Sequence, residues 1–286
     1  MKTILVTGGN GQLAKCIKEV VSGNKKMQFV FANADELDIT NQKEVQTFFD
    51  SNEFDYCINC AAYTAVDLAE KHKKKAQEIN VKGVSNLALT CKNKGTILIQ
   101  ISTDFVFDGE KKEPYTESDD TNPIGVYGQT KLGGEKEIQR LLKKYFIIRT
   151  SWLYSEYGNN FMKTMLKHGK EKDQLNVVND QKGTPTYAKD LAKVILKIIK
   201  SESEDYGLYN YSNEGAISWF DFTKEIFYQE KMEVKTNPVS TSAYPTLAKR
   251  PKNSVLDKTK IKQVFQMEIP YWKDALKEAL NSYRKL

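Results

Sequence analysis

A tyrosine and a lysine four residues apart are the residues whose types and spacing most directly suggest chemistry. Tyr127 and Lys131 stand in a segment with a helical pattern, VYGQTKLGGEKEI. Residues four apart share one face of a helix, so we expect the phenol and the ammonium to lie together. A nearby ammonium favours the phenolate and should lower the pKa of the tyrosine from ~10 toward neutral pH. Such a phenol can pass a proton to or from a carbonyl oxygen.

The Tyr-x-x-x-Lys pattern alone also fits a half-buried tyrosine beside a surface lysine, so its interpretation depends on its surroundings. The segment TILIQIS, Thr96 to Ser102, predicts a strand that ends in Ser102, Thr103 and Asp104. A hydroxyl at a strand end can hydrogen-bond a substrate carbonyl, or it can simply cap a turn. Together with the tyrosine and the lysine, it favours a catalytic interpretation.

A glycine-rich turn near the N-terminus indicates a second site. In VTGGNGQLA, the residues Gly8, Gly11 and Ala14 fit a G-x-x-G-x-x-A/G pattern between a predicted strand, Thr3 to Gly9, and a predicted helix, Gly11 to Val21. Such a turn lets the backbone approach a pyrophosphate closely and directs a helix N-terminus at the anion. A plain turn is the alternative, but the position between strand and helix favours dinucleotide binding.

The second predicted strand, Phe29 to Ala32, should end beside the ribose of such a dinucleotide. Asn33 occupies this strand tip, where an acidic side chain would bind ribose hydroxyls and repel a 2′-phosphate. Asparagine does neither strongly, so we expect NADPH as cofactor and keep NADH open. Asp38 and Ile39 are placed to flank the adenine. The small residues Ala61 and Ala62 should let the cofactor lie against the backbone.

The order of the predicted elements indicates the fold. Strands and helices alternate from residue 1 to about residue 150, which predicts a Rossmann-type α/β fold with a doubly wound parallel sheet. A second helix is expected to begin with Thr40 or Asn41 as its cap. A long third helix is expected from about Lys73 to Cys91, with Gly95 as a stop. Residues 151–286 are less regular and predict a smaller lobe that closes over the carboxyl ends of the strands.

Composition excludes several other classes of protein. The chain of 286 residues is 40% hydrophobic and 28% charged, the balance of a globular protein. Its apolar runs are too short for a signal peptide or a membrane span, so we expect a cytoplasmic protein. The formal net charge is +6, but the basic residues are scattered apart from KHKKK at 71–75. Without a stripe of arginines and aromatics, we expect no nucleic-acid partner.

The cysteines and histidines give no sign of redox or metal chemistry. Cys57 and Cys60 form a C-x-x-C that lies along an apolar run, where odd spacing sends the two thiols to opposite faces of a strand. No second pair supplies zinc ligands, so we interpret them as structural thiols. His72 and His168 have no ligand or triad neighbours in the sequence and are expected at the surface. We identify no metal ligands.

These motifs give the chain its resemblance to a known family. It resembles the extended short-chain dehydrogenases/reductases and, more narrowly, the dTDP-4-dehydrorhamnose reductases. The resemblance covers nearly the whole chain and rests on TGGNGQLA, CAAYTAVDLAE, STDFVFDG, YGQTK followed by GE, IIRTSWLY, GNNFMKTML, VVNDQKGTPT and SAYPTLAKRPKNS. The last three belong to the smaller lobe and separate this family from other sugar-nucleotide enzymes such as the epimerases.

The resemblance implies a reaction and a catalytic trio. Thr103, Tyr127 and Lys131 would reduce the C4 keto group of dTDP-4-dehydro-L-rhamnose, giving dTDP-L-rhamnose for cell-surface polysaccharide. Tyr127 would protonate the C4 oxygen while the nicotinamide delivers hydride. Thr103 would polarise the carbonyl. Lys131 would tune Tyr127 and hold the nicotinamide ribose.

The same resemblance assigns binding residues. Those expected at the cofactor, besides the ones named above, are Gly11, Gln12 and Leu13 at the pyrophosphate, then Ala62, Tyr63 and Thr64. Those expected at the sugar nucleotide are Thr64, Ala65, Val66, Thr103, Asp104, Trp152, Asn160, Gln181 and the segment 250–254 with Arg250 and Asn253. Arg250 suits a diphosphate because its guanidinium presents a fork of donors. Residues 151–286 would thus mainly bind the sugar nucleotide.

Two departures and two alternatives stay open. The family often has an acid where Asn33 stands, and Ala14 replaces a glycine. Some members form metal-assisted dimers, and a homodimer is compatible with this chain. One alternative is a non-catalytic regulatory subunit like the β subunit of methionine adenosyltransferase, which would be isolated with a partner synthetase. The other is a reductase or epimerase of a different nucleotide sugar; an epimerase would retain NAD without net consumption.

Overall fold

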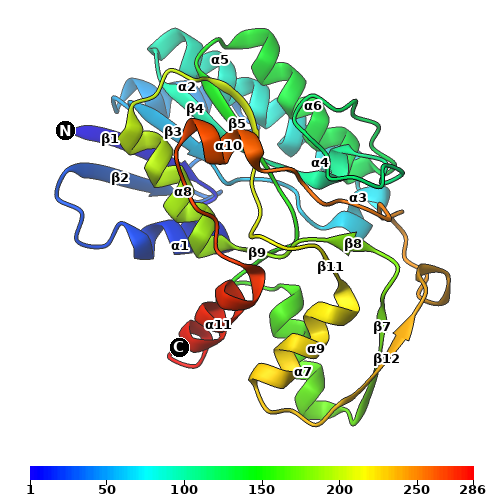
Figure 1. The fold of residues 1–286 in the computed structure, drawn as a ribbon. Coiled ribbons are helices and arrows are strands. Elements are labelled where there is room, and N and C mark those ends of the chain that lie inside the picture. The colour runs from blue at the N-terminus through cyan, green and yellow to red at the C-terminus, as the bar shows by residue number, and fades with distance from the viewer.

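A six-stranded parallel sheet forms the centre of the protein (Figure 1). The computed structural model describes residues 1–286. In spatial order the strands are β2 (Met27–Ala32), β1 (Lys2–Thr7), β3 (Tyr56–Asn59), β4 (Ile97–Thr103), β5 (Tyr145–Thr150) and β10 (Gly207–Asn210). In the four inner strands, β1, β3, β4 and β5, successive side chains are mostly buried on both faces, as is typical of a parallel sheet. The predicted Rossmann-type fold is confirmed, with the order of the strands reversing between β1 and β3.

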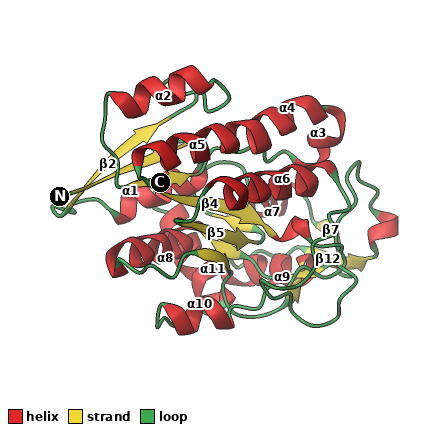
Figure 2. Ribbon diagram, turned by 90° about the horizontal axis from the view of Figure 1, so that it is seen from above, coloured by secondary structure: helices red, strands yellow, loops and turns green.

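Helices cover both faces of this sheet (Figure 2). On one face lie α1 (Gln12–Val20), α8 (Ala188–Ser201) and α10 (Thr259–Val264), and on the other lie α2 (Gln42–Asp50), α5 (Val84–Lys94) and α6 (Val126–Leu141). Alternate residues of β1 show the two-sided burial: Ile4 and Val6 pack with α1 and α8, whereas Leu5 packs with α2 and α5.

Four helical segments follow each other directly between β3 and β4. α3 (Val66–Lys71) is followed by α4 (Lys73–Gln77), a π-helical turn (Glu78–Gly83) and α5. The predicted helix from Lys73 is confirmed, and Gly95 ends it at a φ of 72°, which glycine adopts without strain. Of the two predicted caps for α2, Asn41 is the one used, since its side chain accepts from the backbone N–H groups of Lys43 and Glu44.

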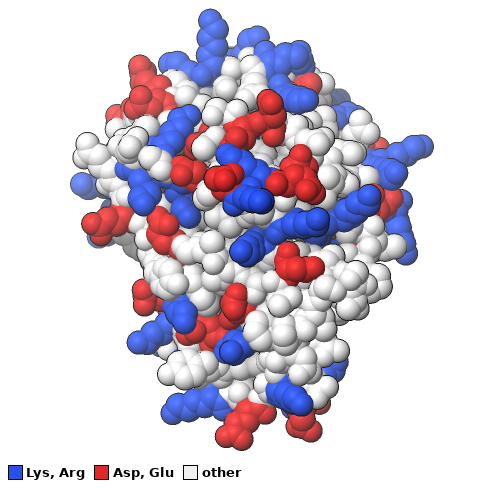
Figure 3. Space-filling model, turned by 45° about the vertical axis from the view of Figure 1, so that its right-hand side comes forward, with Lys and Arg blue, Asp and Glu red and all other residues white.

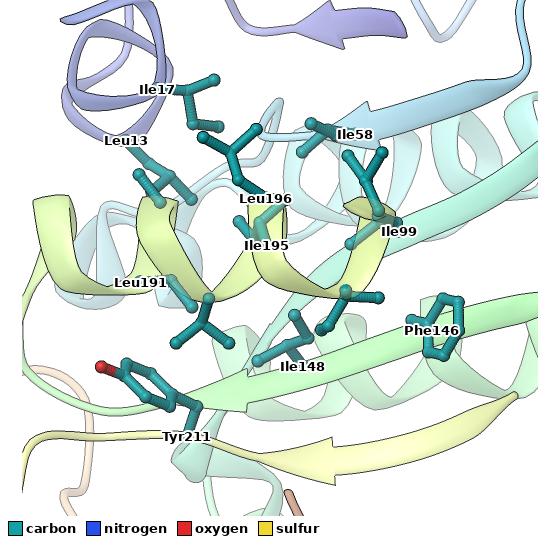
Figure 4. Packing of buried hydrophobic residues seen from close by; sticks show 14 of the residues in the cluster. Leu13, Ile17, Ile58, Ile99, Phe146, Ile148, Leu191, Ile195, Leu196 and Tyr211 are labelled. Carbon is teal, nitrogen blue, oxygen red and sulfur yellow. The ribbon is translucent and has the colours of Figure 1, made fainter. Parts of the chain in front are cut away.

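The sheet extends beyond residue 150, where we placed the end of the first domain. β10 pairs with β5, and α8 supplies buried residues to the same core as α1. Figure 4 shows Leu191 and Ile195 of α8 directed at the strands that carry Ile99 and Ile148. The boundary at residue 150 therefore cuts through this core. The sequence pattern misses this because β10 is a short strand far along the chain.

The second lobe packs around its own core below the sheet in Figure 1. It is formed by α7 (Phe161–Glu171), α9 (Trp219–Gln229) and α11 (Trp272–Tyr283), with the parallel pair β7 (Gln174–Val178) and β12 (Lys235–Val239). Two short pairs join it to the sheet: β6 (Leu153–Tyr154) with β9 (Thr186–Tyr187), and β8 (Lys182–Gly183) with β11 (Ile217–Ser218).

A return segment, residues 240–256, leads from β12 back to the first lobe. It begins with a 3₁₀ turn (Thr241–Ala243) and later makes bridges between Asn253 and Lys182 and between Leu256 and Tyr115. Arg250 in this segment pairs with Asp67 of α3 at 2.7 Å. The return segment therefore ties the second lobe to the edge of the sheet where α3 begins.

The surface mixes both signs of charge. On the face in Figure 3, Lys and Arg side chains lie among Asp and Glu side chains. No helix combines the length and the apolar character needed to cross a bilayer.

Removal of a core side chain from α8 tests whether this helix belongs to the sheet. Ile195 is fully buried, so Ile195→Ala should lower the free energy of unfolding by about 2–5 kcal/mol. Lys200→Ala on the exposed side of α8 should stay within about 0.5 kcal/mol of the parent protein. Urea titration measures both. Equal, small effects would contradict the placement of α8 in the core.

Candidate active site

A cavity of about 1020 Å³ lies at the carboxyl ends of the strands, between the two lobes. Both the sheet and the second lobe contribute to its wall, as expected for an open α/β sheet. The structure brings together fourteen of the residues that the sequence predicts for the site, namely Gly11, Gln12, Leu13, Ala62, Thr64, Val66, Thr103, Asp104, Tyr127, Lys131, Trp152, Asn160, Gln181 and Arg250.

The glycine turn after β1 fits a dinucleotide pyrophosphate. Gly8 has a φ of 64°, and a Cβ there would lie 2.8 Å from the backbone nitrogen of Ala61, so only glycine suits this position. The N-terminus of α1 has no side-chain cap and no acidic residue in its first turn. Its first N–H groups and the positive end of its dipole are therefore available to an anion.

Tyr127 is positioned by the close approach of α6 to the turn after β4. A Cβ on the next residue, Gly128, would lie 2.1 Å from the carbonyl oxygen of Phe105, so a larger residue would push the helix away. The ring of Phe105 packs edge-on against Tyr127, with centroids 5.6 Å apart. The Thr103 hydroxyl lies near the phenol, and both residues line the cavity. The predicted meeting of tyrosine and strand-end hydroxyl is thus present.

The pKa of Tyr127 moves opposite to the direction expected from the sequence. Burial raises the pKa of Tyr127 to about 12, against a smaller lowering by the nearby Thr103 hydroxyl. Lys131 directs its ammonium elsewhere, to the carbonyl oxygen of Ile101 at 2.6 Å. The expectation that the ammonium brings the tyrosine toward neutral pH is therefore wrong for the protein without ligands. The phenol keeps its proton at neutral pH.

Lys131 is buried, and this determines its charge. Burial lowers the pKa of Lys131 to about 8, opposed by the carboxylate of Glu135 and, more weakly, by Cys60. The ammonium is thus retained at neutral pH and lost just above it. Cys60 itself is a poor thiolate, since burial raises its pKa to about 12. The interpretation of Cys57 and Cys60 as structural thiols agrees with the structure, in which Cys57 is buried, Cys60 is partly buried and neither forms a disulfide.

Thr103 and Asp104 combine the two roles that the sequence left open. The Thr103 hydroxyl accepts from the N–H of Phe105 at 3.2 Å and donates to Asp104 Oδ1 at 3.0 Å, so it caps a 3₁₀ turn (Asp104–Val106) and also faces the cavity. Burial raises the pKa of Asp104 to about 6. Its Oδ2 is buried without a hydrogen-bond partner, which makes it an acceptor for a bound hydroxyl.

Trp152 forms an aromatic wall with residues that the sequence did not single out. Its ring stacks on Trp219 with centroids 3.5 Å apart and an interplanar angle of 8°, and Phe161 packs against Trp219. The Trp152 indole also lies against Gly183, where a Cβ would be 2.5 Å from the ring. Trp152 is held at a φ of 47°, a strained backbone for a large residue. Trp152, Trp219 and Phe161 all line the cavity.

Three of the predicted polar residues already have hydrogen-bond partners within the protein. Arg250 makes a forked contact with Asp67 at 2.7 and 3.3 Å, which lowers the pKa of that carboxyl. Asn160 caps α7 and donates to the carbonyl of Ser155 at 2.7 Å. Gln181 accepts from the indole N–H of Trp219. A ligand would have to compete with these partners.

Eight predicted residues lie outside the cavity wall. Gly8 belongs to the glycine turn and packs against the backbone of Ala61. The Asp38 carboxylate accepts from Thr40, Ile39 is buried in the core, and Asn253 donates to backbone carbonyls between Lys111 and Glu113. The complete set is Gly8, Asn33, Asp38, Ile39, Ala61, Tyr63, Ala65 and Asn253. The prediction for His168 is wrong in part, since this side chain is only half-exposed and lines the cavity.

Sequence reasoning also missed a buried ion pair under the site. Glu135 of α6 and Arg149 of β5 are 1% and 4% exposed and contact each other at 2.7 Å. Glu135 stands in the quoted helix segment one turn after Lys131, which is the signal that could have found it. Arg149 lies within an apolar strand pattern, where an arginine is unusual unless it is paired.

A dinucleotide-type sheet with a Tyr-x-x-x-Lys helix at its carboxyl edge is the architecture of the extended short-chain dehydrogenases/reductases, Rossmann-type oxidoreductases that use NAD(H) or NADP(H). More particularly, the chain belongs to the RmlD substrate binding domain family, whose model matches residues 1–285.

Individual relatives agree with this placement. The chain is 42% identical to a dTDP-4-dehydrorhamnose reductase of Aggregatibacter actinomycetemcomitans, over 97% of this chain and 98% of that one. A crystal structure of a dTDP-4-dehydrorhamnose reductase from Clostridium acetobutylicum matches with a TM-score of 0.95 and 44% identity, covering 99% of both chains. The Bacillus anthracis enzyme of the same name, solved in complex with NADP, matches with a TM-score of 0.95 and 41% identity, covering 99% of this chain and all of that one.

Crowding of the aromatic wall tests its part in the site. Gly183→Ala should displace the Trp152 indole, and a loss of about 1.4 kcal/mol in substrate binding would raise KM roughly tenfold. Gly169→Ala is the matched control, because its Cβ crowds Met232 and Phe227 in the second lobe instead. Steady-state kinetics with varied sugar nucleotide measures the effect. The same KM in both variants would remove Trp152 from the substrate wall.

Proposed function

We propose that this protein reduces the C4 keto group of dTDP-4-dehydro-L-rhamnose to give dTDP-L-rhamnose, with NADPH as the reductant. The observation that carries the proposal is the half-buried Tyr127, whose raised pKa keeps its phenol protonated, next to Thr103 at the wall of the cavity. A neutral phenol is the form that a carbonyl reduction needs, since the reaction consumes a proton at the carbonyl oxygen. The relatives named dTDP-4-dehydrorhamnose reductase support the choice of substrate.

The mechanism assigns a task to each of three side chains. When bound, the reduced nicotinamide supplies the hydride that adds to C4. Tyr127 gives its phenolic proton to the C4 oxygen as that oxygen gains negative charge. Thr103 hydrogen-bonds the same oxygen and polarises the carbonyl. The Lys131 ammonium then stabilises the phenolate that proton transfer leaves behind.

The first lobe would hold the cofactor through backbone and small side chains. Gly8, Gly11 and the N-terminus of α1 would receive the pyrophosphate, with Gln12 and Leu13 beside it. Ala61, Ala62 and Tyr63 would border the nicotinamide half. At the adenosine end, the Ile39 side chain is buried, so only the backbone of Ile39 would contact the adenine. Asp38 would lie beside it.

The second lobe and the return segment would hold the sugar nucleotide, which makes residues 151–286 mainly a substrate lobe. Arg250 is the proposed diphosphate ligand, and it would exchange its fork on Asp67 for phosphate oxygens of like geometry. Asp104 would accept a hydrogen bond from a sugar hydroxyl. The remaining contacts are proposed for Thr64, Ala65, Val66, Trp152, Asn160, Gln181 and Asn253.

The setting of the reaction follows from the same proposal. Its direct partners would be the dTDP-sugar and the nicotinamide cofactor, in the cytoplasm, where activated sugars for polysaccharide are made. A homodimer is compatible with the fold, and neither nucleic acid nor membrane has a part in the proposed mechanism.

The experiment that tests this proposal is an absorbance assay of the purified protein with dTDP-4-dehydro-L-rhamnose and NADPH. Loss of the reduced-nicotinamide band together with formation of dTDP-L-rhamnose is the expected result. Tight cofactor binding without consumption would contradict it and favour a regulatory subunit or an epimerase.

Removal of the proposed proton donor gives a second prediction. Tyr127→Phe should reduce kcat by about 10²–10⁴-fold, because general acids contribute that much, while NADPH still binds. Tyr228→Phe is the control, since Tyr228 is 80% exposed and belongs to the second lobe. Stopped assays and NADPH fluorescence titration provide the two readouts. Near-normal turnover of Tyr127→Phe would exclude this residue as the donor.

The cofactor preference is tested at the tip of β2. The Asn33 side chain accepts from the N–H of Asp35 at 2.8 Å, and the backbone N–H of Asn33 donates to the Glu36 carboxylate at 2.9 Å. Asn33→Asp adds a negative charge where a 2′-phosphate would lie, so kcat/KM for NADPH should fall about tenfold relative to NADH. Parallel assays with both cofactors measure the ratio. An unchanged ratio would place the 2′-hydroxyl away from Asn33.

A further inference from the structure

A fully buried ion pair lies directly beneath the residues of the proposed reaction. Arg149 donates to Glu135 through Nε at 3.0 Å and through Nη2 at 2.7 Å. The Ser102 hydroxyl donates to the same carboxylate at 2.5 Å. Three elements therefore meet at one side chain: β4 through Ser102, β5 through Arg149 and α6 through Glu135 itself.

The pair continues the catalytic face of α6. Tyr127, Lys131 and Glu135 follow each other at intervals of four residues and so share one face of this helix. α6 is bonded to the end of β4 twice in succession, since Lys131 donates to the carbonyl of Ile101 and Glu135 accepts from Ser102. The next residue of β4 is Thr103. The two contacts thus fix Lys131 and Thr103 relative to each other.

Stability gives little reason for such a pair. Desolvation of two charges commonly cancels their attraction, and apolar residues of similar volume are often as stable. Here the Nη1 atom of Arg149 is moreover buried without a hydrogen-bond partner, although the guanidinium lies 5.1 Å from the centre of the Phe107 ring. A costly group at this position therefore needs another explanation than the free energy of folding.

Charge supplies that explanation. The groups around Lys131 are Tyr127 and Glu135 on its own helix, Cys60 after β3, Asp104 after β4 and Arg149 on β5. The Glu135 carboxylate is the largest influence that opposes burial and keeps Lys131 protonated, whereas Cys60 is a thiol of high pKa. Arg149 and Ser102 in turn hold that carboxylate in place.

We propose that Glu135, held by Arg149 and Ser102, is a positioning residue of the reductase: it fixes α6, and with it Lys131, against the end of β4 and places a carboxylate one helical turn from the Lys131 ammonium. The reductase role rests on the proposed function. The positioning role concerns the placement and charge of Lys131, so it can be tested by cofactor binding as well as by turnover.

The test compares Glu135→Gln with Glu137→Gln. Loss of the Glu135 carboxylate lowers the pKa of Lys131 further, so the ammonium is lost at lower pH. The basic limb of the kcat–pH profile should move to acid by roughly one pH unit. At pH 8 this reduces the protonated fraction from about a half to about a tenth, so kcat falls about fivefold. Glu137 pairs with the exposed Arg140 on the same helix, and its variant should keep the parent profile.

A second variant separates positioning from folding. Glu135→Gln leaves Arg149 without its partner and can cost 3–5 kcal/mol in stability. Glu135→Met with Arg149→Met removes both charges at similar volume, so its unfolding temperature should recover. Its basic limb should nevertheless stay shifted to acid. A recovered stability together with the parent pH profile would overturn the proposal and leave the pair a purely structural element.

Cofactor binding provides the readout that does not need turnover. NADPH fluorescence titration of both Glu135 variants, from pH 6.5 to 9, should show affinity falling at a lower pH than in the parent protein. Parent-like pH dependence of binding would contradict the positioning role. If the parent protein binds NADPH but does not turn over dTDP-4-dehydro-L-rhamnose, the proposed substrate fails while this test still decides the role of Glu135.

Discussion

The close seating of α6 on the end of β4 is the constraint on which the site depends. The helix can come this near only because Gly128 leaves no side chain between it and the carbonyl of Phe105. Within its next two turns, Lys131 and Glu135 bond successive residues of β4. The tyrosine, the lysine and the strand-end threonine thereby come from two rigid elements rather than from mobile loops. Groups held in this way need little reorganisation at the moment of reaction.

Burial determines the protonation of the titratable side chains where α6 packs on the end of β4. Three of these titratable groups are shifted toward their neutral forms, with pKa values of about 12 for Tyr127, about 8 for Lys131 and about 6 for Asp104. The common cause is desolvation of the charged form. The result is a phenol that keeps its proton beside an ammonium that can stabilise the phenolate after transfer. This is a suitable starting state for reduction of a ketone, which takes up a proton at oxygen.

The sequence could predict the parts that depend on local pattern. The glycine turn, the helix of Tyr127 and Lys131 and the strand end at Thr103 follow from periodicity and turn chemistry, and the structure brings them to one edge of the sheet. Contacts between distant segments could not be predicted in this way. The stacking of Trp152 on Trp219 and the pairing of Glu135 with Arg149 join residues that no spacing rule relates. β10 likewise pairs with β5 although it lies far along the chain from the first five strands.

To predict the direction of a pKa shift, one must know how deeply a side chain is buried as well as which charges lie near it. Spacing correctly placed a lysine one turn from Tyr127, but it could not show how deeply both side chains are buried or that Lys131 turns to the carbonyl of Ile101. Desolvation then outweighs the neighbouring charge. The same limit applies to Arg250, whose fork was expected at a diphosphate and is bound to Asp67 in the protein without ligands.

The measurement that tests the central claim most directly follows the hydrogen atoms. The protein is incubated with dTDP-4-dehydro-L-rhamnose and NADPH that carries deuterium at the transferable C4 position, and the product is examined by mass spectrometry and NMR. The account predicts dTDP-L-rhamnose with one deuterium at sugar C4 and one NADP⁺ formed per product. A product without deuterium, or conversion of the sugar without net loss of NADPH, would contradict the account and indicate epimerase chemistry instead.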